Sequence, residues 1–206
     1  MNKESLKKML GEIVKVMNEE KQHLIELDGA MGDGDLGLTM TSGFTAVYKE
    51  IDNIDSDDIG AVFMKLGMKM NSVVPSTMGT LISICFLKAA KEAKGKTEID
   101  LLTASKMGRA AVNGVMERGK AKVGQKTMLD ALDPAVRALE KSAEENGDTK
   151  TAFQNAYEAA KQGVEGTKKI KSVHGRAAYY GEKSLGRPDS GATAVMFIFK
   201  GMAQSF

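Results

Sequence analysis

Hydrophobic residues recur at helical spacing along almost the whole chain, and strand-like alternation is nearly absent. One stripe at i, i+3, i+4, i+7 spacing is formed by Ile59, Val62, Phe63, Leu66 and Met70. Such stripes predict eight helices, at about residues 3–27, 37–50, 57–73, 77–94, 98–118, 127–146, 149–168 and 190–204. No linker, repeat or low-complexity tract separates them, so we expect a single all-α domain over residues 1–206.

Composition and charge exclude several classes of protein. With 29 basic and 27 acidic residues the net charge is +2, whereas a dedicated nucleic-acid binder is usually strongly basic. A lone cysteine, Cys85, forms neither a disulfide nor a cysteine zinc site and suits a reducing compartment. The longest apolar stretches, 81–87 and 192–199, are too short to span a membrane. We therefore expect a cytoplasmic protein that contacts neither nucleic acid nor membrane directly.

An acidic loop separates the first two predicted helices. It contains Asp28, Asp33 and Asp35, and residues 26–58 hold nine acidic residues but one lysine. Three carboxylates held close together repel one another unless a cation lies between them, and oxygen ligands suit Mg²⁺ or Ca²⁺. An EF-hand is excluded, because the twelfth position from Asp33 is Phe44. The alternative is a turn in which Asp33 and Asp35 cap the next helix.

Phosphate binding is the natural companion of a magnesium site, because Mg²⁺ usually completes its coordination shell with substrate phosphates. Residues 37–39 begin a helix directly after the acidic loop, and helix N-termini bind phosphate. Residues 161–187 carry seven basic residues against two acidic ones, and Arg176 lies there beside a glycine. It either binds phosphate or belongs to a solvated basic surface. Residues 76–80 and Thr127 open further helices as phosphate ligands or as simple caps.

Four polar segments carry a resemblance to a known family. They are LDGAMGDGDLGLTM, GMKMNSVVPSTMGTL, RGKAKVGQKTMLDALDP and GRAAYYGEKSLGRPDSGATAVMF. In this order and spacing they resemble the nucleotide-binding L subunits of bacterial dihydroxyacetone kinases, and the resemblance covers essentially the whole chain. It implies eight antiparallel amphipathic helices in a closed up-and-down barrel, with the nucleotide site at one end.

The resemblance also implies a mechanism. In the phosphotransferase-system form, a phosphohistidine on an M-type subunit phosphorylates tightly held ADP to ATP in place. The L subunit then passes the γ-phosphoryl group to dihydroxyacetone, which a K-type subunit holds covalently. This chain would be a phosphotransferase active only with its partners, and no residue of its own would be catalytic. Two alternatives stay open: a subunit of an ATP-dependent kinase for another small ketose, and a nucleotide-sensing partner of a transcriptional regulator.

Individual positions follow from the same resemblance. Asp28, Asp33 and Asp35 match the carboxylates that hold two Mg²⁺ ions between the phosphates. The positions that match contacts to ADP or ATP are Leu36, Gly37, Leu38, Thr39, Thr77, Met78, Gly119, Met128, Arg176, Pro188, Asp189 and Ser190. Two departures lie at the phosphates: the family usually has histidine at the position of Leu36, and a Gly-Gly-Ser-type turn at the position of residues 75–78.

Overall fold

The computed structural model describes all residues from 1 to 206 and consists of helices without strands, which confirms the all-α class. The α-helices are α1 (Lys3–Glu19), α2 (Lys21–Gly29), α3 (Leu36–Glu50), α4 (Ile59–Val73), α5 (Thr77–Glu92), α6 (Leu101–Gly119), α7 (Leu129–Glu144), α8 (Thr149–Thr167) and α9 (Ser190–Gln204). Two 3₁₀ helices, η1 (Ile51–Asn53) and η2 (Arg176–Ser184), lie in the connections.

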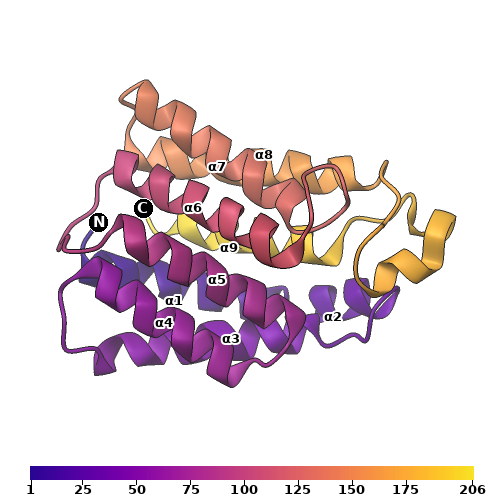
Figure 1. Ribbon diagram of the computed structural model, residues 1–206, viewed down its shortest axis with the longest axis horizontal. Coiled ribbons are helices and arrows are strands. Elements are labelled where there is room, and N and C mark those ends of the chain that lie inside the picture. The colour runs from indigo at the N-terminus through magenta and orange to yellow at the C-terminus, as the bar shows by residue number, and fades with distance from the viewer.

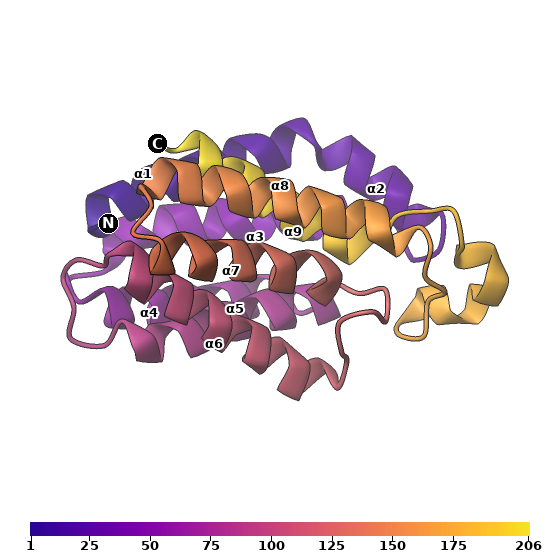
Figure 2. The same cartoon turned by 90° about the horizontal axis from the view of Figure 1, so that it is seen from above.

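Eight of these helices form the barrel that the resemblance implies (Figures 1 and 2). From α3 to α9 each helix packs against the next one along the chain, α1 packs against α3, and α9 packs back against α1. This last contact closes the ring. The remaining helix, α2, extends α1 beyond the ring and contacts α3 and α9.

The first predicted helix, 3–27, is in fact two helices. Glu20, with φ −96° and ψ 5°, ends α1 outside the helical region, and α2 starts at the next residue. No apolar residue lies between Met17 and Leu24, so no side-chain packing holds the helix straight across this polar stretch. The other predicted helices agree with the structure to within a few residues at each end.

The start of α7 shows how a proline is accommodated inside a predicted helix. This helix begins at Leu129 and contains Pro134. The preceding turn is held by the carboxylate of Asp130, which accepts the backbone N–H groups of Gly124 and Thr127 at 2.5 and 2.7 Å. The proline, which has no N–H to donate, therefore lies one turn into a helix whose start is fixed by Asp130.

The hydrophobic core lies inside the ring. Its largest fully buried side chains include Ile13, Met17, Phe44 and Leu66, and each contributes about 1.5–3 kcal/mol by leaving water. The ring also encloses an apolar cavity of about 160 Å³, to which Leu10, Phe86 and Phe199 contribute. Neighbouring helices are thus joined through one shared core rather than pair by pair.

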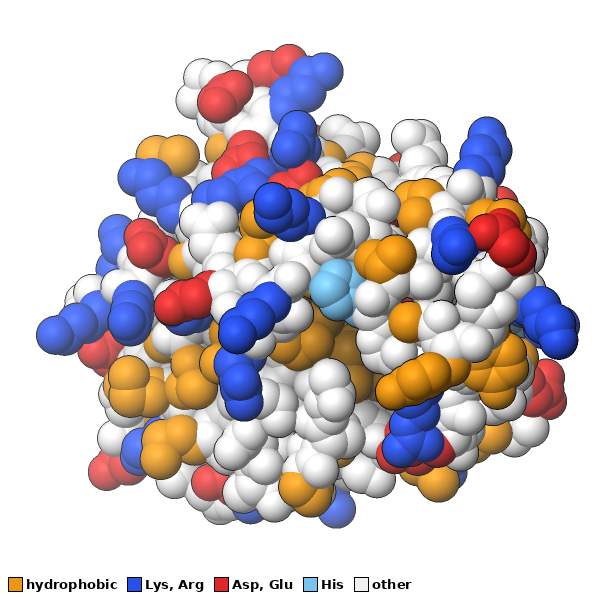
Figure 3. Space-filling view, turned by 45° about the vertical axis from the view of Figure 1, so that its right-hand side comes forward, with side chains coloured by type: hydrophobic (Ala, Val, Ile, Leu, Met, Phe, Trp, Pro, Cys, Tyr) orange, Lys and Arg blue, Asp and Glu red, His pale blue; other side chains and the backbone are white.

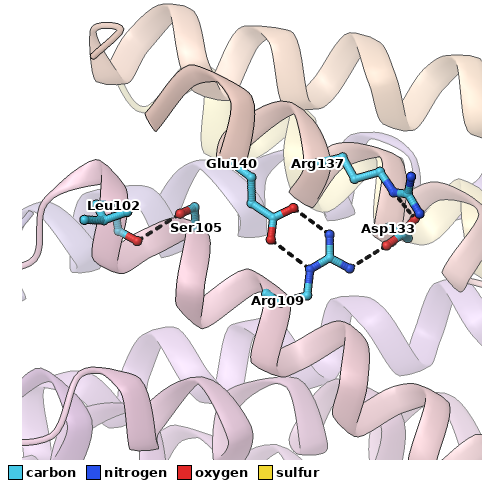
Figure 4. Close-up of polar contacts among 6 residues, drawn as sticks. All are labelled: Leu102, Ser105, Arg109, Asp133, Arg137 and Glu140. Carbon is cyan, nitrogen blue, oxygen red and sulfur yellow. Dashed lines mark hydrogen bonds and ion pairs between the residues drawn. The ribbon is translucent and has the colours of Figure 1, made fainter. Parts of the chain in front are cut away.

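A charged clamp joins α6 to α7 (Figure 4). The Arg109 guanidinium binds both oxygens of Glu140, at 2.8 and 2.6 Å, and one oxygen of Asp133, at 2.6 Å. The other oxygen of Asp133 accepts from Arg137 at 2.7 Å. These carboxylates raise the pKa of Arg109 above its usual range. The Asp133 side chain is 5 % exposed, so this clamp fixes the α6–α7 contact from a partly desolvated position.

Up-and-down connectivity places alternate connections at the same end of the barrel. The α2–α3, α4–α5, α6–α7 and α8–α9 connections all lie at the right-hand end in Figure 1, which we call the loop end. Both chain termini lie toward the opposite end. The four segments that carry the family resemblance therefore meet at one end of the molecule. None of the helices combines the length and the apolar character that crossing a membrane requires.

Candidate functional site

The predicted metal ligands converge at the loop end. Asp28 lies in the last turn of α2, and Asp33 and Asp35 lie in the loop before α3. One carboxylate oxygen from each lies within 4.8 Å of one from each of the others, and we call these three residues the acidic group. Gly34 permits this convergence, because its φ of +73° turns the chain so that its N–H reaches Asp28 Oδ2 at 2.9 Å.

Two distant segments hold the acidic group in place. The Ser190 hydroxyl, from the start of α9, donates to Asp28 Oδ1 at 3.0 Å. Arg176, the first residue of η2, pairs with Asp33 at 2.8 Å. Arg176 therefore faces the acidic group, although 65 % of its side chain remains exposed.

Asp35 has the least compensated charge of the three. It occupies the N-cap position of α3, but its side chain makes no capping hydrogen bond, so the capping alternative is wrong for this residue. Partial removal from water, and then the charges of Asp33 and Asp28, raise its pKa, while Arg176 opposes them. Three carboxylates facing one guanidinium leave an excess of negative charge. This all-oxygen donor set fits a hard divalent cation such as Mg²⁺.

Residues 36–39 form the first turn of α3, directly after the acidic group. Leu36 and Thr39 are buried, and Leu38 is half exposed. Gly37 lies against α2 so closely that a Cβ would stand 2.2 Å from the Lys21 carbonyl oxygen. The Thr39 N–H donates to the Asp35 carbonyl at 2.9 Å, but the amides of residues 36–38 have no intrahelical acceptor, which makes this turn a candidate anion site next to the carboxylates.

The first turn of α5 lies at the same end, and no hydrogen bond or ion pair joins it to the acidic group. Ser76 caps this helix by accepting the Gly79 N–H at 3.0 Å, so its hydroxyl has the capping role. Thr77 is exposed and its hydroxyl makes no hydrogen bond, while Met78 packs against the edge of the core. Thr77 is thus the one hydroxyl of residues 76–78 that is free to accept a ligand.

The remaining predicted contacts lie around the starts of α7 and α9. Met128 is buried immediately before α7, and a Cβ on Gly191 would lie 3.6 Å from it, so these two helix starts are adjacent. Gly119 ends α6 near Leu81 of α5. Pro188 directly precedes the cap of α9, Asp189.

Asp189 combines a capping role with an unfavourable environment. Its carboxylate accepts the Ala192 N–H at 2.8 Å. Removal from water raises the pKa of Asp189 to about 6; the charges of Asp130 and Asp28 act in the same direction, while the Ala192 N–H and Lys126 oppose them. Negative charge therefore extends from the acidic group toward the start of α9.

The sequence did not single out two contacts between the α6–α7 and α8–α9 connections. Lys126 is buried and its pKa is lowered by desolvation, yet its ammonium reaches three backbone carbonyls. Next to it, Gln125 Oε1 lies 2.8 Å from His174 Nε2. A lysine in a glycine-rich loop has no periodic signature, and only the fold shows that its side chain turns inward.

The surface on the side of the loop end is hollowed (Figure 3). Lys and Arg side chains lie around the hollow, and hydrophobic side chains are visible on its floor. Such a combination suits a ligand with an apolar ring system and anionic groups.

Comparisons with known proteins identify the family. The DAK2 domain family matches residues 30–204. "PEP-dependent dihydroxyacetone kinase, ADP-binding subunit DhaL" of Escherichia coli (strain K12) is 35 % identical over 188 residues, which cover 91 % of this chain and 90 % of the relative. "PEP-dependent dihydroxyacetone kinase 1, ADP-binding subunit DhaL" of Listeria innocua is 34 % identical over 189 residues, with 92 % and 89 % covered.

A solved structure supports the fold independently. The dihydroxyacetone kinase from C. freundii in complex with AMP-PNP and Mg²⁺ matches with a TM-score of 0.74 at 24 % identity. The match covers 97 % of this chain and 33 % of that one, so this chain spans about a third of the larger kinase. With four motif segments at one end of a closed helical barrel and a family match over most of its length, the chain belongs to the DAK2 domain family.

Proposed function

We propose that this chain is the ADP-binding subunit of a multi-subunit dihydroxyacetone kinase of the phosphotransferase-system type. The observation that carries the proposal is the convergence of the acidic group with Arg176 and Ser190 at the loop end. The two DhaL relatives support it, since each is similar over about nine tenths of both chains. The lone cysteine supports a cytoplasmic location.

The chain's contribution to catalysis is to bind and orient Mg²⁺ and nucleotide. Asp28, Asp33 and Asp35 would hold two Mg²⁺ ions, which neutralise charge on the transferring phosphoryl group. The first turns of α3 and α5 bind phosphate oxygens through free amides and the Thr77 hydroxyl. Arg176 lies close enough to the acidic group to add a guanidinium contact to the same phosphates. Gly119, Met128 and residues 188–190 surround the rest of the nucleotide.

Phosphoryl transfer then needs two partners. A phosphohistidine on an M-type subunit donates the phosphoryl group to ADP held at the loop end. This chain presents the γ-phosphoryl group to dihydroxyacetone bound by a K-type subunit. The resemblance places no covalent anchor for the ketone on this chain, and its two histidines, His23 and His174, are not assigned to phosphoryl transfer.

A second candidate is a subunit of an ATP-dependent kinase for another small ketose. Leu36 favours it, because this side chain is only 5 % exposed and packs into the core where the family usually has histidine. The Pro75–Met78 turn departs from the family at a second phosphate-binding position. A third candidate function is that the chain senses nucleotide and binds a transcriptional regulator, which is compatible with a role as a kinase subunit.

Calorimetric titration with ADP tests the metal and nucleotide site. We expect ADP to bind in the presence of Mg²⁺ and much more weakly in EDTA; equal affinity in both would contradict the proposal.

Turnover assays test the subunit assignment. The chain with ATP and dihydroxyacetone should show negligible turnover. Substantial turnover should appear only when K-type and M-type partners and a phosphoryl source are added. Robust turnover by the chain alone would show that it is not a subunit of this kind.

A further inference from the structure

Lys126 is the only buried lysine of the protein, and no carboxylate pairs with it. It lies 2 % exposed in the connection before α7. Its Nζ donates to the carbonyl oxygens of Thr167, Ser184 and Arg187 at 3.0, 2.6 and 2.7 Å. Three acceptors match the three N–H donors of an ammonium group, which is the arrangement that makes a buried lysine tolerable.

The three acceptors lie at the two ends of one segment, residues 168–189: Thr167 directly precedes it, and the other two lie near its C-terminal end. Thr167 ends α8, Ser184 ends η2, and Arg187 lies just before α9. We call residues 168–189 the Arg176 segment, because it carries that arginine. Within this segment, the Gly186 N–H donates to the Lys168 carbonyl oxygen at 2.8 Å and so joins its two ends. Lys126 therefore binds this segment from outside, at the point where it leaves and rejoins the barrel.

The backbone conformation of Lys126 also indicates that its side chain has a specific role. Its φ is +57°, in the left-handed region that favours glycine over residues with a Cβ. Backbone geometry alone would thus favour glycine at this position. What a lysine adds there is its ammonium group and the contacts to the Arg176 segment.

We propose that Lys126 is a positioning residue that fixes the Arg176 segment, so that Arg176 stands over the acidic group. The consequence for nucleotide binding rests on the proposed function, whereas the effect on the segment does not. Lys126 touches neither the acidic group nor Arg176 itself. It acts through the three backbone carbonyls that anchor the two ends of the segment.

Amide hydrogen exchange of the ligand-free protein tests the effect on the segment. Lys126→Met removes the ammonium and keeps most of the side-chain volume. We expect faster exchange across residues 168–189 and unchanged exchange in α3 to α5. Lys122→Met is the matched control, since Lys122 lies in the same connection, is exposed and makes no side-chain hydrogen bond. Unchanged exchange in 168–189, or an equal increase in every helix, would overturn the proposal.

A double-mutant cycle with Arg176→Ala tests whether Lys126 acts through Arg176. Lys126→Met and Arg176→Ala should each weaken Mg²⁺-dependent ADP binding by about tenfold, the loss expected for one contact to a charged group. The double variant should lose less than the product of the two single losses, because the position of a missing arginine no longer matters. Losses that multiply to about a hundredfold would overturn the proposal, as would normal affinity in Lys126→Met.

Failure of the proposed function is distinguishable from failure of this inference. If the wild-type protein does not bind ADP with Mg²⁺, the proposed function is wrong, while hydrogen exchange still decides the role of Lys126. If Lys126→Met does not fold, Lys126→Gln, whose amide retains two N–H donors, is measured in the same two experiments. Two donors cannot serve three carbonyls, so exchange in the segment should still rise in Lys126→Gln; wild-type exchange together with a wild-type affinity for ADP would reject the proposal.

Discussion

The three aspartates of the acidic group differ in what holds them. Asp28 accepts two hydrogen bonds and Asp33 pairs with Arg176, but Asp35 has no partner, and partial removal from water together with its neighbours' charges raises its pKa. We predict that Asp35→Asn raises the melting temperature of the metal-free protein, because it removes repulsion without removing a contact. The same change should weaken Mg²⁺-dependent ADP binding by about tenfold or more.

Asp28→Asn is the matched comparison for Asp35→Asn. It removes the same charge but disturbs the bonds from Gly34 and Ser190, so its metal-free melting temperature should be lower than that of Asp35→Asn. Thermal melts and ADP titrations of both variants check these outcomes. A lower melting temperature for Asp35→Asn than for the wild type, together with wild-type affinity, would mean that this loop does not bind metal.

Asp189 predicts a pH dependence of stability. Its pKa is raised from 3.8 to about 6 in the folded protein, so between these values the unfolded chain is ionised and the folded protein keeps the proton. This group therefore lowers the free energy of unfolding as pH rises through that window, and it contributes no cost below it. Asp189→Asn retains an acceptor for Ala192, so we expect it to stabilise the protein at pH 7 by about 3 kcal/mol at most.

Urea denaturation at pH 4 and pH 7 measures this difference. The gain from Asp189→Asn should be large at pH 7 and small at pH 4. Asp148, the cap of α8, is the control with the opposite sign: hydrogen bonds from Thr151 lower its pKa, so its ionised form stabilises the fold. Asp148→Asn should therefore cost stability at pH 7. The same sign of effect for both variants at pH 7 would contradict the assignment for Asp189.

Between helices, the Arg109 clamp makes a prediction about α6 and α7. Arg109→Met leaves the buried Asp133 and its neighbour Glu140 without their shared partner, and should lower the free energy of unfolding by about 1–3 kcal/mol. Arg137→Met removes an arginine that is 72 % exposed from the same Asp133, and should cost less than about 1 kcal/mol. Chemical denaturation measures both; equal losses would show that burial of the clamp does not matter.

Helices of the ring were predictable because each buries one face in a common core. The stripe through Ile59, Leu66 and Met70 falls inside α4 as expected. The separate α2 was not predictable from periodicity, because Leu24 is its only buried side chain. Likewise, the spacing of Asp28, Asp33 and Asp35 in the sequence predicted that they lie close together. The contact of Ser190 with Asp28 was not predictable, because it joins residues 162 positions apart. Such contacts depend on the closure of the barrel, which no local pattern encodes.

Closure of the whole barrel brings the residues of the site together. Because α9 packs against α1, the start of α9 lies beside the loop that follows α2, and Ser190 reaches Asp28. The two connections that carry opposite charge, at residues 26–35 and 168–189, are thereby brought together. Neither connection alone combines carboxylates for a metal with an arginine for phosphate. The site is thus a property of the closed ring.

Ligand binding should therefore stabilise the molecule as a whole, since metal and nucleotide join connections from opposite ends of the sequence. With Mg²⁺ and ADP at a hundred times the dissociation constant, binding adds about 2.7 kcal/mol to the free energy of unfolding. For a chain of 206 residues this corresponds to a rise in melting temperature of about 5–10 °C. ADP with EDTA and Mg²⁺ alone are the controls, and each should show at most a small shift, whereas Asp35→Asn with both ligands should keep about half of the shift or less, because it binds about tenfold or more weakly. Because the metal-free loop is strained by its own charge, the largest part of the stabilisation should need both ligands together. A shift of the same size in ADP with EDTA would instead indicate a nucleotide site that does not use the acidic group.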